Sequence, residues 1–404
     1  MEKVIIENKQ EFFNCLEDSI FDPEIKDCTF NYFFEYGKIV FQDIIGKNIN
    51  ATNNIISFTN CDFPKGFLFR KTTYHYASKD KFYKLDITFE NCTFYGISFI
   101  EEIIDVKISF FNCQFMQSVG YEHSKNIADS FNFHNITFKK LVSFWKSEFY
   151  TAVAFFQTNF DGNLTFSGAE FYENLLFPYS SFQKKIIFSN VKFIKGFDLS
   201  LALNSGEYNF FGIEIKNFAS ISNDVDSQYD NCLNGCNISN KNKIETFRII
   251  KNQLEKVGNN IEAFKYNSLE KRAYQLQLIA QDKKWYNNQD SLMFSLNNVS
   301  NRHKKSWIKG VGFTIKVAVL FYTLSILLSG EFYLSFDDIY ETINLNLKAI
   351  VVFLNPVHNP NYITEIYNIK SSDLNGWYYA LDFLGRIFVE YGIYQTIQAF
   401  RKFR

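Results

Sequence analysis

The 404-residue sequence contains few of the residues that mark disordered or fibrous chains, with 5 Pro and 18 Gly. It has no excess of either charge, because 42 Lys and Arg stand against 43 Asp and Glu, so no basic surface for nucleic acid is expected. The seven Cys are odd in number and sparse, which favours a reducing compartment over a disulfide scaffold. The charged start MEKVIIENKQEFF lacks the apolar stretch of a secretory signal peptide.

The sequence also lacks recognisable catalytic motifs. It contains no P-loop, no dinucleotide-binding glycine motif, no H-E-x-x-H and no nucleophile elbow. The five His residues are scattered, without the spacing of metal ligands. A CLNGC segment at Cys232–Cys236 has no second ligand pair nearby, which a zinc site requires. We therefore expect a protein that is not an enzyme and uses no metal or other cofactor.

Phenylalanine, in contrast, is abundant, with 48 residues. In the middle of the chain it recurs at alternating steps of five and six, at positions 138, 144, 149, 155, 160, 166, 171, 177, 182, 188 and 193. A helix repeats every three to four residues and a strand every two, so neither explains these steps. Four sides of alternating length give about 22 residues per coil, which predicts a square β-helix with the Phe side chains stacked inside.

The N-terminal part carries the same unit, with Cys two residues before Phe. Its copies are CTF, CDF, CTF and CQF, at Cys28–Phe30, Cys61–Phe63, Cys92–Phe94 and Cys113–Phe115. Residues two apart on an extended segment point the same way, so the Cys and the Phe are both expected inside. A buried free Cys at such a place behaves as a small hydrophobic residue, so we expect packing rather than chemistry.

This unit resembles that of the pentapeptide-repeat family, in which a small residue, a polar residue and Leu or Phe are followed by two more. The resemblance covers about Cys28 to Phe218 and implies a right-handed quadrilateral β-helix over residues 1–240. The sequence departs from the family by an extra residue in alternate units and by insertions at Lys65–Lys84 and Met116–Ser130. Some members mimic DNA with an acidic surface, but runs such as QKKIIF argue against that here.

The pattern changes after Asn240. In KIETFRIIKNQLEKV the apolar residues Ile244, Phe247, Ile250, Leu254 and Val257 have helical spacing, and a second helical pattern follows the turn GNN. These features predict an antiparallel helical hairpin, over residues 241–300, that serves as cap and connector. The stretch resembles the segment that follows the repeats in membrane-attached pentapeptide proteins of bacteria.

Residues 301–404 are expected to form a membrane module. Val311–Ser329 contains a single charge, Lys316, and Trp377–Phe400 begins with aromatic residues, so both suit a spanning helix. The basic runs RHKK and RKFR flank the two spans, so the positive-inside rule predicts N- and C-termini in the cytoplasm. The resemblance implies a multi-pass protein of the bacterial inner (cytoplasmic) membrane.

The second predicted span carries Asp382, Arg386 and Glu390 on one side of a helix, four residues apart. Ionisable groups at membrane depth are costly and normally face a partner, a bundle interior or a water-filled path. Two interpretations remain open. The three side chains form an internal charge ladder that fixes helix packing, or they line a pore in an oligomer.

Between the spans, Leu345–Leu354 is too short to cross a bilayer and is stopped by Asn355 and Pro356. It predicts either a re-entrant helix or one that lies on the membrane surface. The order of span, short helix, loop and span resembles a two-helix ion-channel pore module. LNPVHNP stands where a potassium filter would follow, so potassium selectivity is not expected.

The leading hypothesis is a homo-oligomer in the lipid bilayer whose membrane module conducts ions and whose cytoplasmic β-helix assembles the oligomer or senses a partner. The alternative is a membrane-anchored scaffold without conductance, whose solenoid binds a protein partner. No nucleic-acid partner is expected in either case.

Overall fold

The computed structural model describes residues 3–8, 10–12, 24–31, 34–36, 54–69, 85–100, 103–104, 106–127, 130–216, 237–280, 289–304, 306–329 and 339–401. The chain divides into two compact units, Met1–Val257 and Gly258–Arg404, and each is described by itself. The predicted hairpin over 241–300 crosses this boundary, so the packing of its helices stays a prediction. The segment Cys232–Cys236 lies outside the described residues.

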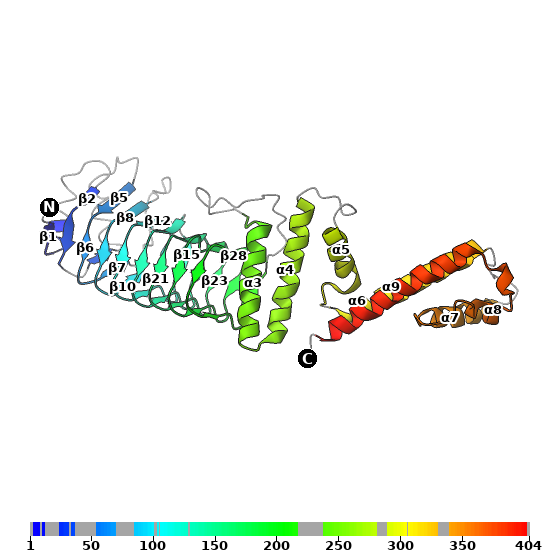
Figure 1. The fold of residues 1–404 in the computed structure, drawn as a ribbon. Helices are drawn as coiled ribbons and strands as arrows, with labels where there is room; N and C mark the ends of the chain where they lie inside the picture. The colour runs from blue at the N-terminus through cyan, green and yellow to red at the C-terminus, as the bar shows by residue number, and fades with distance from the viewer. Residues whose placement is uncertain are drawn as a thin grey trace. The chain divides into compact units, whose positions relative to one another are not determined.

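Short parallel strands of the first unit form four sheets, one for each side of a solenoid coil (Figure 1). The first sheet contains β1 (Val4–Ile6), β3 (Cys28–Phe30), β6 (Asp62–Phe63), β9 (Thr93–Phe94), β13 (Gln114–Phe115), β17 (Thr137–Phe138), β21 (Asn159–Phe160), β25 (Ser181–Phe182) and β29 (Leu203–Asn204). The second contains β4 (Phe34–Tyr36), β7 (Phe67–Phe69), β10 (Ser98–Ile100), β14 (Val119–Gly120), β18 (Val142–Ser143), β22 (Leu164–Thr165), β26 (Ile186–Ile187) and β30 (Tyr208–Asn209).

The other two sheets complete each coil. The third contains β11 (Ile103–Ile104), β15 (Lys125–Ile127), β19 (Glu148–Phe149), β23 (Glu170–Phe171), β27 (Lys192–Phe193) and β31 (Glu214–Ile215). The fourth contains β2 (Glu24–Lys26), β5 (Asn54–Thr59), β8 (Leu85–Glu90), β12 (Val106–Phe111), β16 (Ser130–His134), β20 (Val153–Phe156), β24 (Asn174–Leu176) and β28 (Gly196–Asp198).

Successive coils are offset by 22 residues in the regular part of the solenoid. Phe138 pairs with Phe160, Phe160 pairs with Phe182, and hydrogen bonds such as the one from Ser181 to Asn159 join residues 22 apart. The structure contains about 7 turns. The β-helix with four sides and the period predicted from the Phe spacing are confirmed.

The two predicted insertions have different outcomes. Phe63 pairs with Phe94, a step nine residues longer than the regular one, and much of this extra length, residues 70–84, lies outside the described part of the chain. Phe115 pairs with Phe138, a step only one residue longer than the regular one. Tyr121 is fully buried there and takes an interior place, which the search for Phe overlooked.

The Phe side chains predicted to lie inside form columns that run from coil to coil. The Phe160 ring is stacked 5.2 Å from both Phe138 and Phe182, close to the spacing of paired strands. Rings in neighbouring columns meet edge to face, as Phe155 and Phe160 do at 5.4 Å. Stacked and edge-to-face pairs are both favourable beyond the area they bury, so the repeat stabilises its own neighbours.

Corners of the coil are formed by residues in the left-handed backbone conformation. Asn60, Asn91, Asn112 and Asn190 adopt φ values between 53° and 57°. Asn tolerates this conformation better than most residues, which explains why it precedes the small interior residue in segments such as FTNCDF.

The Cys residues of the repeat lie one above another inside the solenoid, as expected. Cys28, Cys61, Cys92 and Cys113 are free and buried, and Cys61 donates a hydrogen bond to the carbonyl of Thr59 at 3.4 Å. The pKa of the Cys28 thiol is raised, first by the neighbouring Cys61 thiol and then by burial. These thiols therefore serve as packing groups.

Helix α3 (Asn240–Lys256) packs against strand β28 at the end of the solenoid. Its predicted apolar face is buried, and only Val257, at the C-cap, is exposed. Asp198 fixes the helix by accepting hydrogen bonds from Asn242 at 2.8 Å and from Thr246 at 3.1 Å. The helix covers apolar surface that the last coils would otherwise expose.

The second unit is helical. It contains α4 (Asn260–Ala280), α5 (Gln289–Asn301), α6 (Trp307–Ser329), α7 (Ile339–Phe353), α8 (Tyr362–Tyr367), the short 3-10 helix η1 (Ser371–Asp373) and α9 (Gly376–Phe400).

Within the described residues, one segment is long and apolar enough to cross a membrane, Trp307–Leu327, and a third of it is buried. It overlaps the first predicted span, Val311–Ser329. The second predicted span, Trp377–Phe400, lies in α9 but does not reach the same apolar character, because it carries Asp382, Arg386 and Glu390. The two-span topology stays a prediction.

Candidate functional site

Helices α6 and α9 run antiparallel along each other (Figure 1). The Trp307 ring at the start of α6 is 5.2 Å from Phe400 at the end of α9. Further along, a Cβ atom on Gly392 would lie only 2.4 Å from Oγ1 of Thr314, so the two backbones approach closely. Small residues permit this kind of contact between helices, and the pair forms a frame for the site.

The centre of the site is a buried ionic cluster of His358, Asp382 and Arg386. Nε2 of His358 lies 2.8 Å from Oδ1 of Asp382, and Nη2 of Arg386 lies 3.0 Å from Oδ2 of the same carboxylate. Asp382 is fully buried, and the His358 side chain is only 2% exposed. A buried carboxylate is stable only when it is paired, and here two side chains supply the pairing.

The second ring nitrogen of His358 also faces an acceptor. Nδ1 lies 2.6 Å from the backbone carbonyl oxygen of Asn355. A neutral imidazole has one N–H, so both contacts are hydrogen bonds only if the ring and the Asp382 carboxylate together hold two protons.

The cluster attaches the segment that follows α7 to a point well inside α9. Asp382 is six residues from the start of α9, which is about 9 Å along the helix axis. Phe353, the last residue of α7, reaches further, because a Cβ on Gly385 would lie 2.5 Å from its ring and 2.8 Å from Cβ of Phe321. The end of the short helix and the turn after it therefore lie alongside the helix pair rather than at its tip.

Asn355 and Pro356, singled out in the sequence, begin this turn. Asn355 is exposed, Pro356 is partly exposed and Val357 is 86% exposed, whereas His358 points inward. The backbone after the turn is held by α9, where the Tyr378 hydroxyl donates to the carbonyl of Pro360 at 2.7 Å. The turn is thus anchored on one side and open on the other.

A polar triad holds α7 itself. The hydroxyls of Tyr322 and Tyr367 lie 2.6 Å apart, and each is within 2.9 Å of Oδ1 of Asn346. The triad joins the membrane-span candidate α6 to α7 and α8. Unlike the stacked Phe contacts of the solenoid, each of these polar contacts is made by one particular set of side chains.

The predicted charge stripe is divided by the structure. Asp382 and Arg386 form the ion pair, with Arg386 a quarter exposed. Glu390 lies one turn further along α9, is exposed, and joins no ion pair with a described residue. The structure brings together two of the three side chains and leaves the third facing outward.

A second polar contact fixes α5 to α9. Asn301 donates to Oε1 of Gln395 at 2.6 Å, and Gln395 donates to Oδ1 of Asn297 at 2.9 Å. Tyr391 donates to the same Oδ1 at 3.1 Å. The network positions the end of α5 and the turn before α6.

His358 is the residue of the cluster that sequence reasoning missed. Its only signal was its place in LNPVHNP, two residues after Pro356, in the segment that precedes the helix carrying Asp382. Among the described side chains no group of three His, Cys, Asp or Glu is arranged to hold a metal ion. The arrangement holds the loop after α7 against α9.

Comparison of the chain with protein-family models, with curated proteins and with solved structures gives no match.

Proposed function

We propose that the protein is a homo-oligomeric membrane protein whose helical unit forms an ion-conducting pore and whose β-solenoid lies in the cytoplasm. The observation that carries this proposal is the turn from Asn355 to His358, which is fastened to Asp382 about 9 Å inside the α6–α9 pair.

The physical argument concerns backbone groups in hydrocarbon. If α6 and α9 cross the bilayer, the turn lies at membrane depth with Asn355 and Val357 exposed on one protomer. Irregular backbone at that depth is tolerated only where it is covered by protein or lines a water-filled cavity. In a single protomer the exposed side of the turn has neither a protein cover nor a water-filled cavity. Assembly of several protomers around a water-filled pore would supply both.

The surface of α9 supports a place in the bilayer despite its charges. Phe383, Leu384 and Ile387 are exposed, whereas Asp382 between the same turns is buried. The arrangement is apolar outside and ionic inside, which suits contact with lipid or another protomer. Glu390, exposed and unpaired among the described residues, is the candidate for the path lining.

The order of α6, α7, the turn and α9 remains similar to a two-helix pore module in architecture only. The proposal also includes membership of the pentapeptide-repeat family and a location in the bacterial inner membrane, both of which rest on the resemblance of the repeats. It includes cytoplasmic termini as well, which rest on the basic residues that flank the spans. The alternating basic and acidic groups of the solenoid, such as Lys139 and Asp161 at 2.7 Å, offer no acidic surface resembling DNA.

The test is single-channel recording of the purified full-length protein in a planar bilayer, with Glu390→Gln beside it. We expect discrete currents whose amplitude or cation preference changes several-fold in the variant, because a fixed charge at the path concentrates counter-ions. Glu255→Gln, which removes the same charge from exposed α3, is the matched control and should leave currents unchanged. Silence from a verified oligomer, or currents identical in Glu390→Gln, would contradict the assignment.

Asp382→Asn tests the role of the ion pair that Asp382 forms with Arg386. The substitution leaves Arg386 and His358 without their buried carboxylate, which typically costs about 3–5 kcal/mol. We expect a lower free energy of unfolding and open-channel currents that fluctuate, because the turn loses its anchor. A simple change in ion preference is not expected. An altered preference at unchanged stability would place Asp382 on the path instead.

A membrane-anchored scaffold is the second candidate, and a feature of the solenoid surface favours it. Phe111, His134, Phe156 and Tyr179 form an outward aromatic stripe across successive coils, with the His134 and Phe156 rings stacked at 4.9 Å. Tyr179 is 57% exposed. Exposed aromatic groups of this kind suit a protein partner. This function predicts no conductance and a ligand whose binding is lost on Tyr179→Ala.

A further inference from the structure

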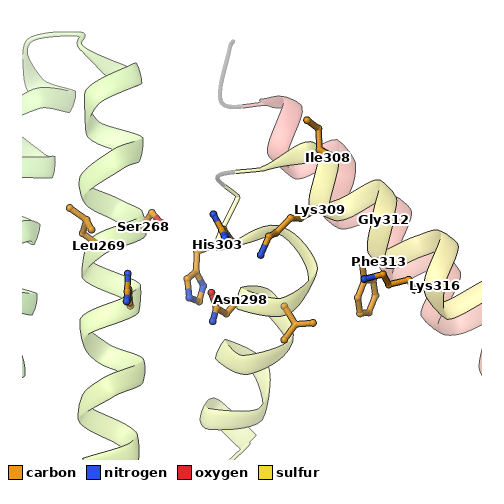
Figure 2. Close-up of a pocket in the computed structure, with 12 residues that line it drawn as sticks. Ser268, Leu269, Asn298, His303, Ile308, Lys309, Gly312, Phe313 and Lys316 are labelled. Carbon is orange, nitrogen blue, oxygen red and sulfur yellow. The ribbon is translucent and has the colours of Figure 1, made fainter. Parts of the chain in front are cut away.

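The second unit contains a cleft that the pore does not use. It has a volume of about 860 Å³ and lies between α4, the end of α5 and the first turns of α6 (Figure 2). Its walls combine polar groups with apolar residues, including Leu269, Val299, Ile308 and Phe313. The volume is in the range of a pocket for a small molecule or a lipid head group.

Four cationic side chains line this cleft: Arg272 from α4, Arg302 after α5, and Lys309 and Lys316 from α6. All four are exposed, and none forms an ion pair with a carboxylate among the described residues. No acidic residue is among those that line the cleft. The cleft is therefore a concentration of positive charge without internal compensation, which attracts an anion.

His303 forms the floor of the cleft between α4 and α5 (Figure 2). The residue is 6% exposed, and neither of its ring nitrogens has a hydrogen-bond partner. Buried polar atoms are nearly always paired, so two unpaired ring nitrogens at the floor of a cationic cleft indicate a missing partner. Burial, followed by the charge of Lys271, lowers the pKa of His303 to about 4.

The backbone at this floor is strained. Arg302, His303 and Lys304 have φ values of 52°, 55° and 72°, three successive residues in the left-handed region without a glycine. This conformation is unfavourable for residues with a side chain, and strain of this kind is concentrated at ligand sites. Asn301 holds the turn by accepting from the Lys304 amide at 2.7 Å and, through its carbonyl, from the Ser306 amide at 3.0 Å. The strained turn places Arg302 and His303 among the residues that line the cleft.

One wall of the cleft is the start of the only described segment apolar enough to span a membrane. Lys309 and Lys316 lie two helical turns apart on the same face, with Gly312 and Phe313 between them. Lys316 is inside the span, where an ammonium group requires a partner or access to the interface. A phosphate held at the membrane surface, with its acyl chains continuing along exposed Ile315 and Val319, satisfies these groups together.

We propose that this cleft binds the phosphate head group of an anionic membrane phospholipid, with Arg272, Arg302, Lys309 and Lys316 as its cationic contacts and His303 at its floor. The inference rests on the proposed membrane attachment of α6 but not on conductance. The bound lipid fixes α4 and the turn after α5 to the membrane surface beside the pore helices.

The experiment uses full-length protein in uncharged detergent, with phosphatidylglycerol or phosphatidylcholine added and bound lipid counted by native mass spectrometry. We expect phosphatidylglycerol to be retained and phosphatidylcholine to be lost. The double variant Arg272→Gln/Lys309→Gln should weaken phosphatidylglycerol binding about 30-fold, since each of the two cations near an anionic lipid contributes about 1 kcal/mol. Both side chains are exposed, so the variant is expected to fold.

Lys265→Gln is the matched single-charge control, because Lys265 is on the same helix α4 but outside the cleft. Equal retention of the two lipids, or equal weakening by Lys265→Gln, would overturn the proposal. Inorganic phosphate that displaces phosphatidylglycerol at similar concentration would identify a site for a soluble anion and overturn the lipid assignment. Because the assay needs no current, loss of lipid binding and loss of conductance are separate results.

Discussion

The solenoid and the helical unit are held together by different kinds of side-chain contact. In the regular part of the solenoid, successive coils repeat the same bulky side chain, so Phe160 is stacked on Phe138 and Phe182 in the same manner. The helical unit has an apolar core of its own, but α7 and the turn after it are also held by single polar contacts, such as His358 to Asp382 and Tyr322 to Asn346. Repeated apolar packing holds successive coils in the same way, whereas single polar contacts hold one particular turn in place.

The difference has a functional consequence. A repeated interior carries no unique chemical group, so the solenoid offers only its surface for recognition. The helical unit contains buried ionisable groups, unpaired ring nitrogens and strained backbone, which are features that carry function. Three variants with matched controls test this contrast.

Phe160→Ala should have the largest effect. Phe160 is 1% exposed, and its removal leaves a cavity between two stacked rings, which costs about 3–5 kcal/mol. The measurement is hydrogen exchange of the full-length protein, with opening free energies read for strands β17, β21 and β25. Phe211→Ala, at a residue 65% exposed, is the control and should change these values by less than about 0.5 kcal/mol. Similar losses in both variants would contradict the stacked interior.

The second largest effect is expected in the pH dependence of the stability of the helical unit. The pKa of buried His303, about 4, lies below its unfolded value of about 6.5, so the unfolded chain takes up the proton first as the pH falls. Stability should be constant above pH 6.5 and should fall by up to about 3 kcal/mol towards pH 4. Thermal unfolding across this range measures it. His303→Gln should flatten the dependence, whereas His134→Gln on the exposed solenoid surface should not.

Gly392→Ala should have the smallest effect of the three. Its new methyl group would lie 2.4 Å from Oγ1 of Thr314 and 3.1 Å from Cα, so α6 and α9 must separate, at a cost of about 1–3 kcal/mol. Gly312→Ala meets nothing within 4 Å and should stabilise its helix by up to about 1 kcal/mol. Thermal unfolding compares the two, and equal shifts would show that α6 and α9 do not pack as described.

Much of the solenoid could be predicted from the chain because its information is local and periodic. A Phe every five or six residues has no other regular explanation, and an Asn before the small residue marks several of the corners, such as Asn60 and Asn190. Tyr121 was overlooked because the period was followed through one residue type. The helices were also predictable, since Ile244, Phe247 and Leu254 show their buried face in the spacing alone.

The candidate site was predictable only in part. The spacing of Asp382, Arg386 and Glu390 indicated a shared side of one helix, and the pair formed by the first two agrees with that. Nothing in the spacing distinguished Glu390, which is exposed, from Asp382, which is buried eight residues earlier. That distinction depends on which face of α9 meets α6 and α7.

The sequence by itself determined the β-helix, its period and the apolar character of α6, because each follows from composition and spacing within a short stretch. The tertiary structure alone decided that His358 meets Asp382 and that Arg272, from a helix 30 residues upstream of Arg302, faces the same cleft. The physical reason is that periodicity reports which face of an element is buried, whereas the partner on that face is chosen by packing between segments distant in the chain.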